Sequence, residues 1–94
     1  KQAKDLESFL LSYKTASPDF QTEYGYPKDQ PSNANLGMCT NYTAHKYNCL
    51  SVTLEMPFKD NANFPDINTG WNGDRSADLG ACAVDAISAV IDFI

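Results

Sequence analysis

Cys49-Leu50-Ser51-Val52-Thr53-Leu54-Glu55-Met56-Pro57-Phe58 is the stretch that decides how the chain folds. Aliphatic side chains alternate in it with small polar ones, which is the pattern of a β-strand with one apolar face. The polar row ends in Glu55, and Pro57 cannot donate an amide hydrogen to a sheet ladder. The stretch therefore predicts a buried strand that stops near Met56 and leaves Glu55 at its carboxyl end, where ligands bind in open α/β sheets.

The residues before this stretch predict one amphipathic helix and little other regular structure. Apolar residues recur at helical spacing from Lys4 to about Thr15. Ser17-Pro18 should end the helix, because the residue before a proline is pushed out of the helical region. A short extended piece is predicted around Tyr24, and a loop rich in turn-forming residues follows from Pro27 to Asn35.

The residues from Asn35 to Tyr47 suit a short helix or a folded loop that leads into the strand. Beyond the strand, Lys59 to Gly73 is rich in glycine, proline and asparagine, which predicts a long irregular connection. The final helix should begin near Arg75, with Asn72 or Asp74 available as its amino-terminal cap. Its broad, alanine-rich face is expected to lie against the apolar side of the strand, which is formed by Leu50, Val52 and Leu54.

Size and charge restrict the classes of function. With 94 residues, the chain suits one small domain. A net charge of −5, with seven scattered Lys and Arg residues, disfavours binding to nucleic acid or to anionic membranes. The sequence shows neither a signal-peptide pattern nor an apolar run long enough to span a bilayer, and we expect a cytoplasmic protein. Cys39, Cys49 and Cys82 match no zinc-ribbon or redox spacing and are expected to be buried, reduced thiols.

A single buried strand is not stable by itself. Its two edges would leave backbone hydrogen-bonding groups unpaired, at a cost of about 1 to 3 kcal/mol for each group. Only the region around Tyr24 offers another candidate strand. We therefore expect the rest of the sheet to lie in polypeptide outside these residues, or in a partner. The isolated segment should then be unstable or self-associate through its open sheet edge.

The strand and the residues after it resemble a known family. The run Ser51-Val52-Thr53-Leu54-Glu55-Met56-Pro57-Phe58 continues into Lys59-Asp60-Asn61, Gly70-Trp71 and a helix that begins near Arg75-Ser76. Together these residues resemble the segment of zinc metallocarboxypeptidases that carries the catalytic glutamate, above all in the cytosolic carboxypeptidase branch and its bacterial relatives. The resemblance implies an α/β fold with a mixed sheet, in which residues 1–94 are the carboxyl-terminal segment of a single catalytic domain.

The resemblance implies that Glu55 is the catalytic residue. In the family, this carboxylate takes a proton from zinc-bound water and later gives it to the leaving amine, which releases the carboxyl-terminal residue of a peptide or protein. The zinc ligands of the family are a His-x-x-Glu pair and a second histidine, and we expect them upstream of this segment. The alternative is that Glu55 only ends a strand and pairs with a nearby Lys or Arg.

The resemblance also assigns two residues to substrate binding. Thr40 would fall on the wall of the pocket that receives the terminal side chain of the substrate, and Thr53 would line the same pocket. The tyrosine that contacts the substrate in the family has no assured counterpart, and Arg75 is expected to open the last helix. A Cys-His nucleophile pair with His45 is disfavoured, because nothing in the sequence marks a thiol as activated.

Two other functions stay open on the sequence alone. A zinc deacylase or amidase of the same fold would act on small N-acyl amino acids or on peptidoglycan peptides. A non-catalytic α/β interaction module could also have kept the segment.

Overall fold

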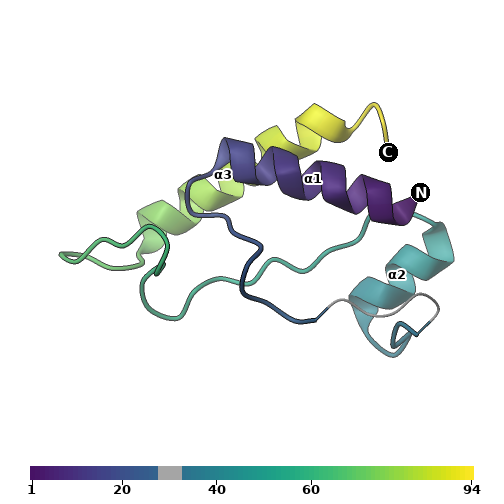
Figure 1. Cartoon of the computed structure of the whole chain (residues 1–94), viewed down its shortest axis with the longest axis horizontal. Coiled ribbons are helices and arrows are strands. Elements are labelled where there is room, and N and C mark those ends of the chain that lie inside the picture. Colours follow the sequence, from purple (N-terminus) through teal and green to yellow (C-terminus); the bar gives the residue numbers. More distant parts are fainter. Residues whose placement is uncertain (28–32) are drawn as a thin grey trace.

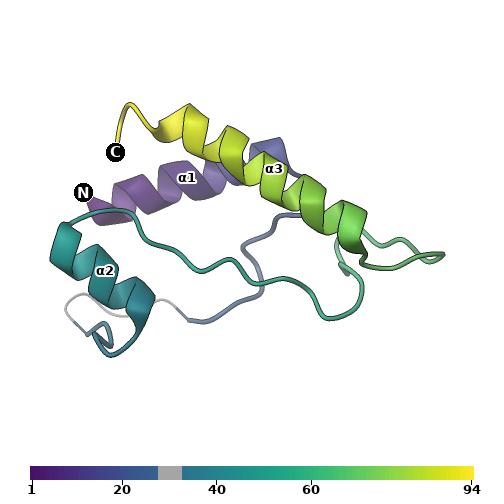
Figure 2. The same cartoon turned by 180° about the vertical axis from the view of Figure 1, so that it is seen from behind.

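Three α-helices make up the regular structure of the computed structural model, which describes residues 1–27 and 33–94. They are α1 (Gln2–Ala16), α2 (Cys39–Tyr47) and α3 (Gly73–Val90). α1 and α3 run antiparallel and lie side by side, whereas α2 lies beyond the start of α1 (Figure 1, Figure 2). None of the helices in the described residues has both the length and the apolar character needed to cross a lipid bilayer.

α1 confirms the helix that the sequence predicts before Ser17-Pro18. The amide of Ser17 donates to the carbonyl of Tyr13 at 2.9 Å, and Ser17 itself is extended, with φ −132° and ψ 125°. Pro18 then prevents a further helical turn. At the start of the helix, Lys1 forms an ion pair with Asp5 at 2.9 Å, and negative charge is favourable at that end.

α3 begins at one of the two caps that the sequence offers. The side-chain oxygen of Asn72 accepts the backbone N–H of Arg75 at 3.0 Å, which confirms Asn72 as the cap. Ala86 is only 1% exposed, and its small side chain lets α3 approach α1 closely. The face of α3 buried in this contact consists of Leu79, Ala86 and Val90.

The core is built around Tyr13 of α1, which is 2% exposed. Its ring stacks on Phe20, with the ring centroids 4.1 Å apart, and meets the ring of Phe9 edge-on at 5.8 Å. Its hydroxyl donates to the backbone carbonyl of Leu79 in α3. Burial raises the pKa of Tyr13, and the nearby Cys82 thiol adds to the rise. Tyr13 therefore joins the two helices through both its ring and its hydroxyl.

The predicted buried strand is not confirmed. Residues 50–57 pair with no other strand, and the described parts of the chain contain no β-strand. Val52 is 43% exposed and Leu54 is 38% exposed, so the expected apolar face is open to solvent. An extended segment becomes a strand only when a neighbour supplies a hydrogen-bond ladder, and residues 1–27 and 33–94 provide none. The expected mixed sheet is not confirmed for the same reason.

One expectation about packing and one about secondary structure are wrong. The buried face of α3 lies against α1, and of the three aliphatic residues expected beneath it only Leu50 packs on the core. The region around Tyr24 forms no strand, because Gln21 exchanges hydrogen bonds with the backbone of Tyr24 and turns the chain. Most of the loop expected from Pro27 to Asn35 lies outside the described residues.

The remaining segments agree better with the predictions made from the sequence. The helix or loop predicted from Asn35 to Tyr47 contains α2, which ends at Asn48 in a left-handed conformation with φ 48°. The connection from Lys59 to Gly73 consists of turns and bends, as predicted. All three cysteines are free thiols, but none is fully buried as expected: Cys39 is exposed at the start of α2, and Cys49 and Cys82 are half-buried.

α3 carries a second apolar stripe that no described residue covers. Val84 is 66% exposed, Ile87 46% and Ile91 55%. Because these residues follow one another at spacings of three and four, they share one side of the helix. The stripe is therefore an apolar surface open to solvent, and Val52 and Leu54 of the extended segment are exposed as well.

We predict that the isolated 94-residue chain self-associates through this surface. Val84→Glu should lower the mass measured by size-exclusion chromatography with light scattering, because a charge resists burial in an apolar contact. Leu11→Glu is the matched control, since Leu11 is 67% exposed but is the one exposed large hydrophobic residue of α1. A monodisperse monomer at high concentration would show that the stripe does not drive association.

Candidate functional site

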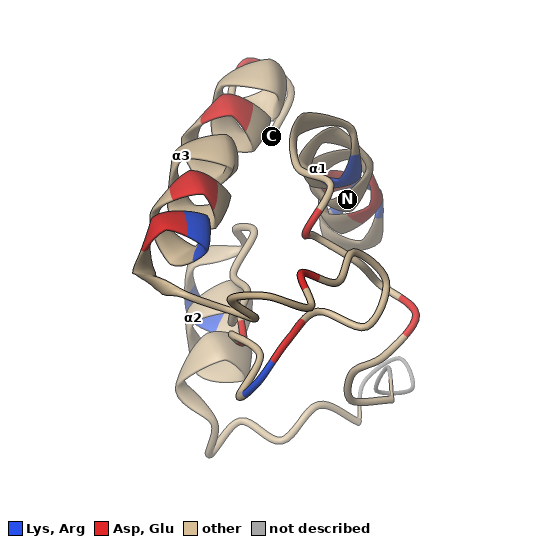
Figure 3. Cartoon of the chain, turned by 90° about the vertical axis from the view of Figure 1, so that its left-hand side faces the viewer, with Lys and Arg blue, Asp and Glu red and all other residues tan. Residues whose placement is uncertain are grey.

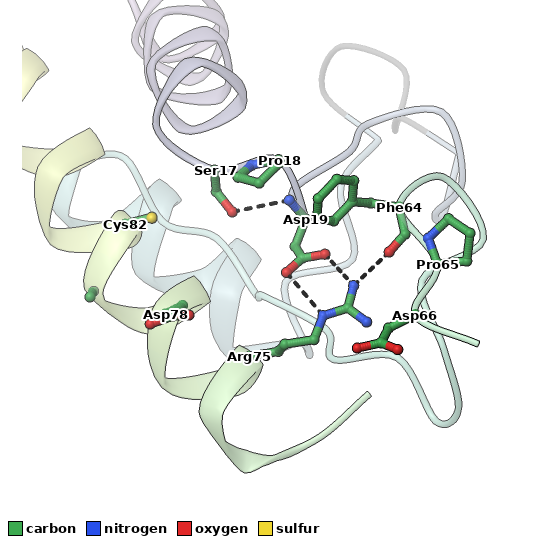
Figure 4. A pocket seen from close by; sticks show the side chains of 10 residues that line it. Ser17, Pro18, Asp19, Phe64, Pro65, Asp66, Arg75, Asp78 and Cys82 are labelled. Carbon is green, nitrogen blue, oxygen red and sulfur yellow. Dashed lines mark hydrogen bonds and ion pairs between the residues drawn. The ribbon is translucent and has the colours of Figure 1, made fainter. Parts of the chain in front are cut away.

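Arg75, in the first turn of α3, uses all five N–H groups of its guanidinium. Nε and Nη2 donate to the carboxylate of Asp19 at 3.4 and 2.6 Å. Nη1 donates to Asp60 at 2.8 Å and to the carbonyl of Gly70 at 3.2 Å. Nη2 also donates to the carbonyl oxygen of Phe64, at a nitrogen–oxygen distance of 2.7 Å (Figure 4). The donors of an arginine form a fixed planar fork, and here every one of them has an acceptor.

Aromatic rings lie over the same guanidinium. Its central carbon is 4.9 Å from the ring centroid of Trp71 and 5.9 Å from that of Phe64, distances at which cation–π attraction acts. The side chain of Arg75 is only 14% exposed. Arg75 is also the only basic residue of α3, whose other charged residues are acidic (Figure 3). We call Arg75 and its partners Asp19, Asp60, Phe64, Gly70 and Trp71 the Arg75 cluster.

The carboxylates of the Arg75 cluster stabilise its charge. The hydrogen bond with Asp19 raises the pKa of Arg75, burial opposes the rise, and Asp60 adds to it. Partial burial by itself would raise the pKa of Asp60. The hydrogen bonds that Asp60 accepts from Arg75 and from the backbone amides of Asp66 and Asn61 outweigh burial, so the pKa of Asp60 is lowered.

A hollow of about 430 Å³ lies beside Arg75, between the end of α1 and the start of α3. Figure 4 shows that Asp19, Phe64 and Arg75 border it with polar groups that are already bonded to one another. A second hollow of about 370 Å³ is formed by residues 58–60 and 66–71. Neither hollow is lined by the residues that the sequence assigns to the site, Glu55, Thr40 and Thr53.

Glu55 lies on the exposed, extended segment and is itself exposed. The ion pairs in the described residues use the carboxylates of Asp5, Asp19 and Asp60, and none uses Glu55. The alternative reading, in which Glu55 pairs with a nearby Lys or Arg, therefore has no counterpart in this part of the chain.

The fold brings Thr40 and Thr53 together. Their hydroxyl oxygens lie 2.6 Å apart, which is hydrogen-bond distance, although 13 residues separate them in the sequence. The bond connects α2 to the extended segment and fixes the chain two residues before Glu55. The two threonines therefore lie together in the structure, and their role in substrate binding stays a prediction.

The chain is similar to parts of larger proteins. No protein-family profile matches it. An uncharacterized protein of Zymomonas mobilis is 46% identical over 76 residues, which are 81% of this chain and 20% of that protein. Among solved structures, a protein assigned to carboxypeptidase A from Shewanella denitrificans OS-217 has a TM-score of 0.92 at 48% identity, over 97% of this chain and 24% of that chain.

Two further solved structures agree with this likeness. A metallo-carboxypeptidase from Burkholderia cenocepacia covers 99% of this chain, with a TM-score of 0.87 and 49% identity. The chain is a segment of the metallo-carboxypeptidase fold. A metallo-carboxypeptidase from Pseudomonas aeruginosa, in complex with (2-guanidinoethylmercapto)succinic acid, has a TM-score of 0.90 and 34% identity over 97% of this chain. The chain spans 24% of each of these solved chains.

The described residues of the chain do not fit a metal centre. Within residues 1–27 and 33–94, no three His, Cys, Asp or Glu side chains lie close enough together to hold an ion. The only histidine of the segment, His45, is exposed in the last turn of α2. Catalytic zinc sites need about three protein ligands.

The sequence did not predict the Arg75 cluster. The sequence assigned Arg75 only to the opening of the last helix. Its main partner, Asp19, lies 56 residues away, so no local spacing connects the two. The one signal available was composition, because Arg75 is the only arginine in a chain with 12 acidic residues.

We predict that acid weakens the Arg75 cluster. The pKa of Asp60 is lowered as described, and the pKa of Asp66 is lowered because Thr69 and neighbouring amides donate hydrogen bonds to it. Near about pH 4 the unfolded chain therefore binds more protons than the folded chain, and the free energy of unfolding rises with pH. The stability from these carboxylates should be complete above about pH 5 and lost as the pH falls through their lower folded pKa values.

Urea denaturation between about pH 3 and about pH 6 measures this dependence. Asp60→Asn should flatten it, because the substitution removes one of the two titrating groups. Asp85→Asn, which replaces an exposed aspartate of α3 outside the cluster, should leave the pH dependence of stability unchanged. Equal pH dependence in the wild type and in Asp60→Asn would contradict the prediction.

Proposed function

We propose that these residues form part of the catalytic domain of a zinc-dependent metallo-carboxypeptidase, which releases the carboxyl-terminal residue of peptides or proteins. The observation that carries the proposal is the likeness to solved proteins named as carboxypeptidases, at 34% to 49% identity over 97% to 99% of the chain. The neighbours' names support a peptide carboxyl terminus as the substrate.

In this proposal, residues 1–94 are the carboxyl-terminal segment of a single catalytic domain. Two features support a larger domain. The solved neighbours are longer, since the segment covers 24% of each. The unpaired residues 50–57 and the apolar stripe of α3 are surfaces that further strands would cover, and such strands would supply the missing ladder. We place the zinc ligands in that remaining polypeptide.

Glu55 is proposed as the group that transfers the proton. A carboxylate next to the attacking water accepts its proton as a general base and returns it, as a general acid, to the leaving amine. In the described residues no ion pair neutralises Glu55, and its exposure leaves it accessible from outside this segment. Glutamine has the same shape and cannot shuttle the proton.

Thr40 and Thr53 are proposed as part of the pocket for the terminal side chain of the substrate. Their bond of 2.6 Å holds α2 beside the segment that carries Glu55. Two small hydroxyl-bearing side chains offer neither the negative charge that attracts a basic residue nor a large apolar wall for an aromatic one. We also propose a cytoplasmic location, which the three free thiols favour.

We predict that Glu55→Gln in the full-length protein lowers kcat about 10² to 10⁴-fold and leaves the melting temperature unchanged, because the side chain is exposed in this segment. Release of single carboxyl-terminal amino acids from peptides, followed by mass spectrometry, is the measurement. Glu7→Gln and Glu23→Gln replace the other two glutamates, which are also exposed, and should keep full activity.

The outcome also separates the competing functions. Unchanged activity in Glu55→Gln and Glu55→Ala would remove the catalytic role and favour a non-catalytic module. Cleavage of N-acyl amino acids without release of carboxyl-terminal residues would favour a deacylase or amidase.

We predict that Thr40→Val and Thr53→Val change the preference for the terminal residue. Each variant replaces a hydroxyl by a methyl group, which should alter the ratio of kcat/KM between peptides with polar and apolar ends by roughly tenfold. Thr43→Val, in the same helix and also half-buried, is the control. Identical ratios in all variants would place the threonine pair outside the pocket.

A further inference from the structure

Within the part of the chain that the structure describes, hydrogen bonds hold the span that carries Glu55 only at its two ends. Before it, Thr53 bonds Thr40. In the described parts of the chain, the next hydrogen bonds after Thr53 are those of Lys59 and Asp60. The carboxyl-terminal side of this span therefore depends on whatever fixes Lys59 and Asp60, and a ladder with further strands would fix only the residues up to Pro57.

The residues after this span form a closed loop, 59–71. The amide of Trp71 donates to the carbonyl of Lys59 at 3.2 Å and joins the two ends of the loop. Arg75 bonds the loop near its start, in its middle and near its end, at Asp60, Phe64 and Gly70. One side chain from α3 therefore holds the whole loop.

The same guanidinium fixes the loop to the end of α1. Asp19, three residues after α1, accepts two of its hydrogen bonds. Asn61 of the loop donates to the carbonyl and to the carboxylate of Asp19 at 3.0 and 3.1 Å. The side chain of Asp19 is 9% exposed and that of Arg75 is 14% exposed, so water competes little for these bonds. The loop accordingly has one position relative to the two helices.

We infer that Arg75 is a positioning residue for Glu55. It holds the loop that fixes the carboxyl-terminal end of the span on which Glu55 lies, and it contacts no reacting group itself. The inference rests on the proposed catalytic role of Glu55. Lysine is a poor substitute, because an ammonium group has three donors and no planar fork. A catalytic group displaced by about 1 Å can lose about a hundredfold in rate.

The test compares Arg75→Lys and Asp19→Asn with a matched control in the full-length protein. Asp19 and Asp5 both have side chains that are 9% exposed, and both form an ion pair. Asp5 pairs with Lys1 at the opposite end of α1. Asp5→Asn therefore alters an equally buried carboxylate without touching the loop, and Asp19→Asn keeps the inference testable if Arg75→Lys does not fold.

Hydrogen exchange of backbone amides gives a readout that needs no activity. Arg75→Lys and Asp19→Asn should speed exchange of the hydrogen-bonded loop amides of Phe64, Asp66 and Trp71 about tenfold or more relative to Asp5→Asn, because the charged hydrogen bonds that hold the loop are lost. Exchange near Ala86, in the contact between α1 and α3, should change equally little in all three variants. Unchanged exchange at these loop amides in both cluster variants would overturn the inference.

Peptide cleavage gives the second readout. In Arg75→Lys and Asp19→Asn, kcat should fall about ten- to a hundredfold while KM stays within about threefold, since the substrate still binds. Asp5→Asn should keep the wild-type kcat even if its melting temperature falls as far as those of Arg75→Lys and Asp19→Asn. An equal fall of kcat in Asp5→Asn at equal stability would also overturn the inference. If the wild type releases no carboxyl-terminal residue, the proposed function fails, and exchange still decides whether Arg75 holds the loop 59–71.

Discussion

The guanidinium of Arg75 is the point at which three separate parts of the chain meet. The first turn of α3 carries it, and the turn after α1 and the loop 59–71 each supply acceptors to it. Because all five donors are used, loss of any acceptor leaves a partly buried donor without a partner, which is costly. The core around Tyr13 joins the helices, and the Arg75 cluster then fixes the irregular segments on them.

The helices could be predicted because their determinants are local. The apolar spacing of α1, the Ser17-Pro18 stop and the cap at Asn72 each lie within a few residues of the element they define. The strand at residues 50–57 could not be settled in this way, because a ladder depends on polypeptide remote in the sequence. The spacing of apolar residues also does not show which element a helix packs against. The apolar face of α3 was therefore assigned to the strand, although it packs on α1.

The same limit applies to the candidate site, of which only a part could be predicted from the sequence. The resemblance picked out Glu55 and paired Thr40 with Thr53, and the structure does bring the two threonines together. Neither composition nor resemblance revealed the partners of Arg75. A charged side chain meets its partners only through the folded geometry, and the sequence shows no more than an excess of acidic over basic residues, 12 against seven.

The hydroxyl of Tyr13 meets the backbone of Leu79 across 66 residues of chain, and this separation matters while the protein is being made. Ribosomes add roughly 5 to 20 residues per second. The first helix therefore leaves the exit tunnel seconds before its partner exists, with its aromatic side uncovered. Until α3 has been made, the side of α1 that packs on Leu79, Ala86 and Val90 lacks this cover, and a pause in translation before α3 would prolong the interval.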